Sequence, residues 1–363
     1  MLPIEASALR FLVKVLCATL FLSLLPGCSA RMNSVPLSAQ NPVAFHLEHE
    51  GPLGIFDPSF AQSPDGIFWM SYSSVDFGWS DPRNGAVSTR LARSNDAVRW
   101  SVMAGALNPS VSKGASRQTV HEVSNLVFDA SAPENEKWKI FWHEYEWVAG
   151  ERDFRHGWIS MRTSANPEGP YSSRKKLFVG WGFLSDGQDE PLIRLDLLHA
   201  DLGGCVAFTE PAAIYHDGSL YLALTCAQIL KSRGRIILLR ESGSEWTYVG
   251  TILTNDADAA PTGYDGFSAP EFAQVGPQLH LIVTPTIGDI YAGCAIYSIE
   301  DLRTASVRRL SGRATLSRFI AGPARFQGAC GFRGGSSPDL YFGEAHFDEL
   351  PIFHLFRFPF PDL

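Results

Sequence analysis

The chain repeats one phrase at two widely separated places: an acid followed by proline, then an Asp-Gly pair, then a segment rich in aromatic and aliphatic residues. The first copy runs from Asp57-Pro58 through Asp65-Gly66, and the second runs from Glu210-Pro211 through Asp217-Gly218. Each copy predicts two strands joined by a hairpin, because Asp and Gly tolerate the positive φ of tight hairpin turns. The repeat predicts a modular all-β protein in which equivalent strands gather around an axis and bring the two carboxylates together.

The same succession of strand, turn and strand predicts five units. They begin near Gly54, Thr119, Cys205, Tyr264 and Ala321. A β repeat of about 50 to 70 residues is typical of a β-propeller with one four-stranded blade per unit. We therefore predict a five-bladed β-propeller over residues 43–363, and a composition with 12% aromatic residues and 23 prolines fits many short strands joined by turns.

The last unit lacks one strand. We expect residues 43–47 to supply it and to close the ring, since an unpaired strand edge invites aggregation. Residues 180–204 do not follow the strand-turn-strand repeat, and their polar and apolar residues do not alternate. We expect them to form a long loop between blades, and long loops in compact domains often border a site.

The N-terminus predicts a secreted and anchored protein. Arg10 and Lys14 precede an apolar run over residues 15–25 that is too short for a comfortable membrane span. Residues 25–28, Leu-Pro-Gly-Cys, resemble the lipobox of bacterial lipoproteins, which implies a signal peptide over residues 1–27 and a lipid on Cys28. Residues 28–42 then form a flexible tether, and Ser29 after the cysteine implies the outer membrane of the cell envelope.

The net charge argues against nucleic acid as a partner, and the cysteines indicate disulfides or buried thiols rather than a metal site. The formal net charge is −8, so we expect no nucleic acid, whose phosphates require a basic surface. Once Cys17 leaves with the signal peptide and Cys28 is acylated, four cysteines remain: Cys205, Cys226, Cys294 and Cys330. In an oxidising compartment we expect either two disulfides, with three possible pairings, or buried thiols, and their spacing predicts no metal site.

Taken in order, these phrases resemble the five-bladed β-propeller glycosidases, above all glycoside hydrolase family 43 and its relatives. The likeness covers nearly the whole chain after the tether. Asp57-Pro58 and Glu210-Pro211 carry it, together with the phrases at residues 92–96 and 169–171. The resemblance implies a monomeric hydrolase that cleaves an arabinofuranoside-like or xyloside-like bond in an oligosaccharide or polysaccharide.

The resemblance also implies three axial carboxylates. Asp57 matches the general base, which takes a proton from the attacking water and so gives inversion at the anomeric carbon. Glu210 stands where the family has an orienting and pKa-tuning Asp. The donor position falls on Ser268, whose hydroxyl is too weak an acid, so we predict Glu271, three residues later, as the acid, with Asp265 as another candidate.

Sugar contacts need flat apolar faces and polar groups for hydroxyls. For the platforms we predict Trp79, Trp181 and Tyr264, with Trp147 and Phe267 as further candidates, although packing between blades is an alternative role for each. Glu122, beside His121 at the start of a strand, is predicted to bind a sugar hydroxyl or to form an ion pair at the rim.

No cofactor is predicted. Some members of the family hold an axial calcium ion through a histidine of the fifth blade, but here Gly328-Ala329-Cys330 stands near that place. The Asp-to-Glu change at Glu210 and the misplaced donor leave two alternatives open: a non-catalytic carbohydrate-binding envelope lipoprotein, and a scaffold whose faces bind other envelope proteins.

Overall fold

The computed structural model describes residues 42–47, 50–78, 85–114, 116–184, 192–243, 245–288, 290–321, 326–347, 350–361 and 363. The predicted signal peptide, nearly all of the predicted tether, Cys28 and Trp79 lie outside these residues, so the expectations about them stay predictions. Within the described part of the chain, no helix is long and apolar enough to cross a membrane.

All described strands except one short separate pair belong to five sheets in chain order, which we call blades 1 to 5. Neighbouring strands in these sheets are antiparallel, except for one parallel pair at the edge of blade 2. Blade 1 contains β2 (Ile55–Gln62), β3 (Phe68–Asp76), β4 (Ala86–Ser94) and β5 (Ser101–Val102). Blade 2 contains β7 (Arg117–Phe128), β8 (Trp138–Val148), β9 (Glu151–Ser164) and β10 (Lys175–Val179), with β6 (Val111–Ser112) and β11 (Ile193–Arg194) at its edges.

Blade 3 contains β12 (Ala207–His216), β13 (Ser219–Ala227), β14 (Arg235–Ser242) and β15 (Glu245–Thr254). Blade 4 contains β16 (Gly266–Val275), β17 (Gln278–Ile287), β18 (Ile290–Tyr291), β19 (Cys294–Asp301), β20 (Ser306–Val307) and β23 (Leu316–Ile320). Blade 5 contains β24 (Phe326–Arg333), β25 (Asp339–Phe347), β26 (Pro351–Pro359) and β1 (Val43–Phe45), and β21 (Arg309–Leu310) pairs separately with β22 (Arg313–Ala314).

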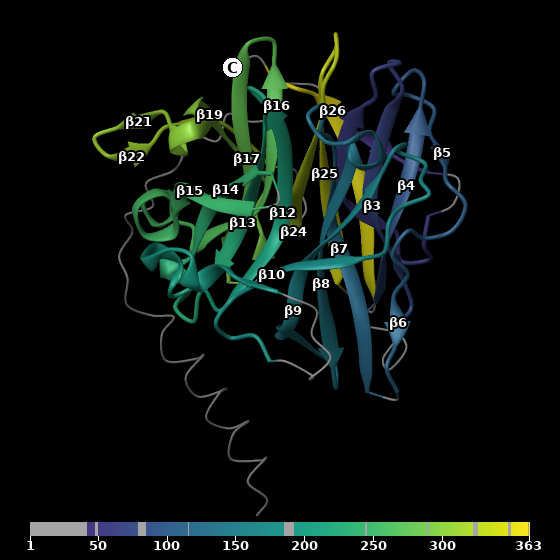
Figure 1. Ribbon diagram of the computed structural model, residues 1–363, viewed down its shortest axis with the longest axis horizontal. Helices are drawn as coiled ribbons and strands as arrows, with labels where there is room; N and C mark the ends of the chain where they lie inside the picture. Colours follow the sequence, from purple (N-terminus) through teal and green to yellow (C-terminus); the bar gives the residue numbers. More distant parts are fainter. Residues whose placement is uncertain are drawn as a thin grey trace, which may run out of the picture. The chain divides into compact units, whose positions relative to one another are not determined.

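The sheets close into a ring. The first strands of the blades, β2, β7, β12, β16 and β24, are neighbours in that order, and β24 returns to β2. In Figure 1 the yellow strands β25 and β26 lie between the green strands of blade 4 and the purple and blue strands of blade 1. The short strand β1 pairs with β26, with Val43 opposite Arg357, which confirms that the N-terminal segment completes blade 5.

Each blade is buried on both faces. In β13, Tyr221 and Ala223 pack into a core shared with blade 4, whereas Leu220, Leu222 and Leu224 pack into a core shared with blade 2. A strand covered on both faces needs apolar residues in succession rather than alternation. This explains why the second strand of the repeated phrase is so rich in aromatic and aliphatic residues.

Every first strand carries a bulge at the same place. Its pairing with the second strand shifts register there, and one residue adopts a positive φ. We call these five residues the bulge ring: Asp57 (51°), Val123 (48°), Glu210 (55°), Ala269 (44°) and Ala329 (51°). A non-glycine residue in the left-handed region costs about 1–2 kcal/mol, and bulges of this kind re-aim side chains near functional sites.

The two Asp-Gly pairs differ. Asp217 and Gly218 form the predicted two-residue hairpin with positive φ at both positions, flanked by the pair His216 and Ser219. The tight hairpin predicted at Asp65-Gly66 is wrong, because the connection from β2 to β3 takes residues 63–67. There only the glycine has a positive φ, and the Ser63 hydroxyl donates to Asp65 within the longer turn.

The four cysteines form two disulfides rather than buried thiols, and the structure selects one of the three pairings. Cys205 bonds to Cys226 within blade 3, and Cys294 bonds to Cys330. The second bond joins β19 of blade 4 to β24 of blade 5. It therefore links the last two blades of the ring covalently.

Candidate active site

Three carboxylates from three successive blades converge near the axis. Asp57 and Glu210 belong to the bulge ring, and Glu122 immediately precedes the bulge residue Val123. All three are buried, with 4%, 9% and 7% exposure for Asp57, Glu122 and Glu210 respectively. Burial raises the pKa of Asp57 well above its usual range, and the negative charges of Glu122 and Glu210 raise it further. The predicted convergence of Asp57 with Glu210 is therefore present, and Glu122 joins them.

The carboxylate of Asp57 is held on one side only. The Ser73 hydroxyl donates to its Oδ2 at 3.2 Å, and the same hydroxyl accepts the Val123 N–H at 3.2 Å. The other oxygen, Oδ1, is buried without a hydrogen-bond partner among the described residues. A buried acceptor with no partner is costly. Asp57 is therefore fixed by one oxygen while the other keeps its capacity to accept a proton.

Glu210 is held on both sides. Its Oε1 accepts the Tyr291 hydroxyl at 2.6 Å, and its Oε2 accepts the Ala269 N–H at 2.8 Å together with the Ser268 hydroxyl. All of these donors come from blade 4. Burial raises the pKa of Tyr291 well above its usual range, and the negative charges of Glu210 and Asp57 raise it further. The phenol therefore keeps its proton and remains a hydrogen-bond donor. Three donors make Glu210 a fixed acceptor.

Glu122 has a different environment. Burial raises its pKa, whereas Arg152 and a hydrogen bond from Tyr145 lower it and Glu210 raises it. Arg152 is exposed at the start of β9, and its guanidinium carbon lies 5.5 Å from the centroid of the Trp147 ring. Its own pKa is raised, first by Tyr145 and then by Glu122 and other groups of this centre. The site thus combines a buried carboxyl with an exposed cation.

Glu271, the predicted acid, lies in a layer beyond the bulge ring. It stands two residues after the bulge residue Ala269, as Ser59 and Asn125 do in their own blades. The Asn125 amide nitrogen donates to Ser59 Oγ at 2.8 Å and to Glu271 Oε2 at 3.1 Å, and the Asn125 oxygen accepts the Ala213 N–H at 2.9 Å. We call Ser59, Asn125 and Glu271 the Asn125 layer. Burial raises the pKa of Glu271 well above its usual range.

The other predicted contacts separate into two groups. Trp181 is 44% exposed, and the exposed Asp265 accepts the Gly288 N–H at 2.6 Å. Tyr264 packs against the core between blades 3 and 4, and Phe267 is buried within it. Trp181 and Asp265 are therefore accessible, whereas the rings of Tyr264 and Phe267 pack between blades, the alternative role given for them above.

His121 and Glu122 diverge as alternation along a strand requires. The Trp142 indole donates to His121 Nδ1 at 3.0 Å, and burial lowers the pKa of His121 to about 3. His121 is therefore a neutral packing residue. The sequence analysis did not identify Tyr145, Arg152 or Tyr291. For Tyr145 and Arg152, the available signal was the aromatic and charged residues around the β8–β9 turn.

The fifth blade does not fit an axial metal ion. Gly328 and Ala329 have no ligating side chain, and the Cys330 sulfur is bonded to Cys294. Within the described residues, no group of three or more His, Cys, Asp and Glu side chains is arranged to hold a metal.

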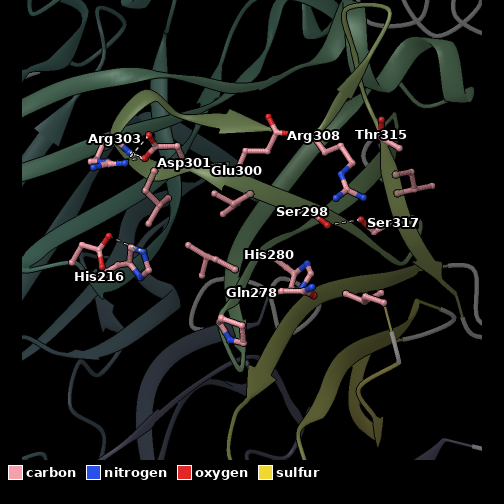
Figure 2. A pocket seen from close by; sticks show the side chains of 17 residues that line it. His216, Gln278, His280, Ser298, Glu300, Asp301, Arg303, Arg308, Thr315 and Ser317 are labelled. Carbon is pink, nitrogen blue, oxygen red and sulfur yellow. Dashed lines mark hydrogen bonds and ion pairs between the residues drawn. The ribbon is translucent and has the colours of Figure 1, made fainter.

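A polar pocket of about 800 Å³ lies at the other end of blade 4, where β16 turns into β17. Figure 2 shows Asp301 paired with Arg303 on one side, and the hydroxyls of Ser298 and Ser317, 3.0 Å apart, on the other. The exposed Glu300 also lines it. No residue of the bulge ring lines this pocket, so it is separate from the axial carboxylates.

Solved glycoside hydrolases have a similar fold. A thermostable family-43 glycoside hydrolase matches with a TM-score of 0.52 and 12% identity over 88% of this chain and 94% of that one. An alpha-L-arabinofuranosidase from Lactobacillus brevis matches with a TM-score of 0.51 and 12% identity over 86% and 93%. A family 117 glycoside hydrolase produced by the marine bacterium Zobellia galactanivorans matches with a TM-score of 0.54 and 12% identity over 87% and 89%.

At the level of sequence, no family model matches the chain, and no curated protein matches it either. The similarity to solved structures, at 12% identity, therefore establishes the fold alone. It confirms the predicted fold class: the chain is an all-β, five-bladed β-propeller of the kind found in these glycoside hydrolases.

Proposed function

We propose that this protein is a glycoside hydrolase that cleaves a glycosidic bond in an oligosaccharide or polysaccharide with inversion. The observation that carries the proposal is the convergence of Asp57, Glu122 and Glu210 from three blades, in a fold that glycoside hydrolases also have. A pair of carboxyl groups flanking the scissile bond is what most glycosidases use.

Asp57 is the general base. Its raised pKa makes it a stronger base than an ordinary Asp, and its Oδ1 accepts no hydrogen bond from any residue that the structure describes. In the proposed reaction this oxygen takes a proton from water as the water oxygen bonds to the anomeric carbon. Glu210, fixed by three donors, supplies the negative charge that helps to keep the pKa of Asp57 high.

The proposed substrate class is an arabinofuranoside or a xyloside. The sequence resemblance implies this class, and one of the structural neighbours is an alpha-L-arabinofuranosidase. The exposed Trp181 ring offers an apolar face for a sugar. Asp265, on the loop before β16, offers a carboxylate for sugar hydroxyls.

The proposal is tested with a panel of aryl glycosides and natural disaccharides, using the wild type and Asp57→Asn. We expect sugar release from at least one arabinofuranoside or xyloside, and a loss of about 10²–10⁴-fold in Asp57→Asn, the usual contribution of a general base. Wild-type activity that survives in Asp57→Asn would contradict the assigned base.

A second candidate function is carbohydrate binding without hydrolysis. Ser268 occupies the position that corresponds to the proton donor in glycoside hydrolase family 43. It has no carboxyl group, and its hydroxyl donates a hydrogen bond to Glu210. Binding on a glycan array, with no reducing sugar released by the wild type from any of the bound glycans, would select this function over hydrolysis.

We also propose that the protein is anchored in the cell envelope through a lipid on Cys28. Expression with radiolabelled palmitate should label the wild type and leave Cys28→Ser unlabelled. Label in both proteins, or in neither, would exclude Cys28 as the anchor.

A further inference from the structure

We propose that Glu122 of blade 2 is the proton donor of this site, in place of a residue from blade 4. The inference rests on the proposed glycosidase function and adds the residue that function still lacks. It is carried by the position of Glu122 in the bulge pattern and by the contacts of the neighbouring acids.

Glu122 occupies in blade 2 the place that Ser268 occupies in blade 4. Glu122 pairs with His143 and Ser268 pairs with Thr284, and each is the last regular pair before the bulge. Each also precedes the residue with positive φ in its strand. Because the blades are related by rotation about the axis, equivalent positions lie at the same level. The donor carboxyl that Ser268 lacks is therefore present at the same level, two blades away.

The other buried carboxyls near the axis, Asp57, Glu210 and Glu271, have different tasks. Glu210 accepts three hydrogen bonds on its two oxygens, so it is committed as an acceptor. Asp57 is the proposed base. Glu271 belongs to the Asn125 layer, where the Asn125 amide donates to it. Glu122 is the remaining acid that lies with Asp57 and Glu210.

The surroundings of Glu122 favour a neutral carboxyl that can be reprotonated. The side chain is 9% exposed, and burial disfavours its charged form. Tyr145 and Arg152 act in the opposite direction and stabilise the carboxylate once the proton has left. A donor needs both properties, because it must hold its proton before the reaction and release it during the reaction.

The Glu122 carboxyl O–H gives its proton to the glycosidic oxygen as the bond from that oxygen to the anomeric carbon breaks, and the bonding pair stays on the oxygen of the leaving alcohol. Asp57 takes one proton from the water whose oxygen forms the new bond. Asp57 ends protonated and Glu122 ends ionised, and exchange of one proton with solvent restores both.

The test compares Glu122→Gln on two substrates with the same sugar, an alkyl glycoside and a dinitrophenyl glycoside. A dinitrophenolate leaves without protonation, so loss of the donor should matter for the alkyl substrate alone. We expect kcat to fall by about 10²–10⁴-fold on the alkyl glycoside and by less than about tenfold on the dinitrophenyl glycoside. Glu300→Gln, in the pocket at the other end of blade 4, is the matched control and should behave as wild type on both.

Three results would overturn the assignment: equal losses on both substrates in Glu122→Gln, no loss on either, or the selective loss in Glu271→Gln instead. If the wild type cleaves neither glycoside, the proposed function itself fails, and the donor assignment falls with it. Thermal unfolding of each variant checks that it is folded.

If Glu122→Gln does not fold, Tyr145→Phe tests the same assignment. Tyr145→Phe removes a hydrogen bond that lowers the pKa of Glu122. The donor should then stay protonated to higher pH, so the alkaline limb of the kcat/KM profile should move upward. An unchanged alkaline limb would contradict a donor at Glu122.

Discussion

Replacing Glu271 by glutamine should change how the stability of the propeller depends on pH. Glu271 is 7% exposed, and its neighbours in the Asn125 layer are neutral: Asn125 donates to it, and Ser59 hydrogen-bonds to it. Glutamine has nearly the same shape and keeps an acceptor oxygen for Asn125. The substitution therefore removes one ionisable group with little change in packing.

The sign of the pH dependence follows from the number of protons that the folded and unfolded states bind. Burial raises the pKa of Glu271 in the folded protein well above its usual range, whereas an unfolded Glu has a pKa of about 4.3. Between these two values the folded state holds a proton that the unfolded chain has released. The stability that this group contributes is complete below the unfolded pKa and is lost as the pH rises through the folded pKa.

The magnitude is about 1.4 kcal/mol per pH unit for one group while the pH lies between the two pKa values. Glu271 should therefore account for about 1.4 kcal/mol of lost unfolding free energy for each pH unit above the unfolded pKa, until the folded pKa is reached. The pKa values of Asp57 and Glu122 are also raised by burial and add losses of the same sign. Both acids remain in the variant, so the difference between the two proteins isolates Glu271.

Urea denaturation followed by tryptophan fluorescence gives the unfolding free energy of wild type and Glu271→Gln across this pH range. The wild type should lose stability faster with rising pH than the variant, by about 1.4 kcal/mol per unit. Parallel curves for the two proteins would show that Glu271 does not hold a proton in the folded state, and would refute the burial argument.

Three other variants test the contact of Glu210 with Tyr291, the disulfide between blades 4 and 5, and the effect of Arg152 on Glu122. Tyr291→Phe removes a hydrogen bond to the Glu210 carboxyl, worth about 0.5–1.5 kcal/mol, so kcat/KM should fall by about two- to tenfold; unaltered steady-state kinetics would contradict a role for this contact. The Cys294→Ala/Cys330→Ala protein opens a 36-residue loop and should lose about 4 kcal/mol in urea denaturation, whereas a loss below about 1 kcal/mol would argue against the covalent link between blades. Arg152→Ala removes a charge that lowers the pKa of the proposed proton donor, so the alkaline limb of the kcat/KM profile should move to higher pH, and a downward movement would reverse the proposed sign.

The sequence predicted those parts of the fold that local pattern determines. The repeated acid-proline phrase predicted that Asp57 and Glu210 occupy equivalent places in two units, because an acid before proline at the same offset in two units is visible without coordinates, whereas the bulges at these two residues were not predicted. The closing strand at residues 43–47 followed from the missing strand of the last unit. Disulfides were one of two expectations for four remaining cysteines in an oxidising compartment, but their pairing needed the positions of β19 and β24.

The sequence did not predict how deep each acid lies along the axis. A bulge inserts one residue into a strand, so the offset between Ser268 and Glu271 does not translate into a simple alternation of sides. The structure places Ser268 just before the bulge and Glu271 in the Asn125 layer beyond it.

The partners of the acids also come from remote segments. Tyr291 reaches Glu210 across 81 residues of chain, and Arg152 approaches Glu122 from the third strand of blade 2. Single-sequence patterns carry no information on such tertiary contacts. Glu122 itself was predicted as a substrate contact because its strand could be recognised, whereas its place among the other carboxylates depends on the curvature of the ring.

We propose that the axial carboxylates promote hydrolysis of a glycosidic bond by direct attack of a water molecule activated by Asp57. Proton NMR of the reaction mixture, recorded within the first minutes, reports the anomeric configuration of the sugar as it is released. We predict that the first sugar to appear has the configuration opposite to that of the substrate. Release with the original configuration, or no release from any arabinofuranoside or xyloside, would contradict it.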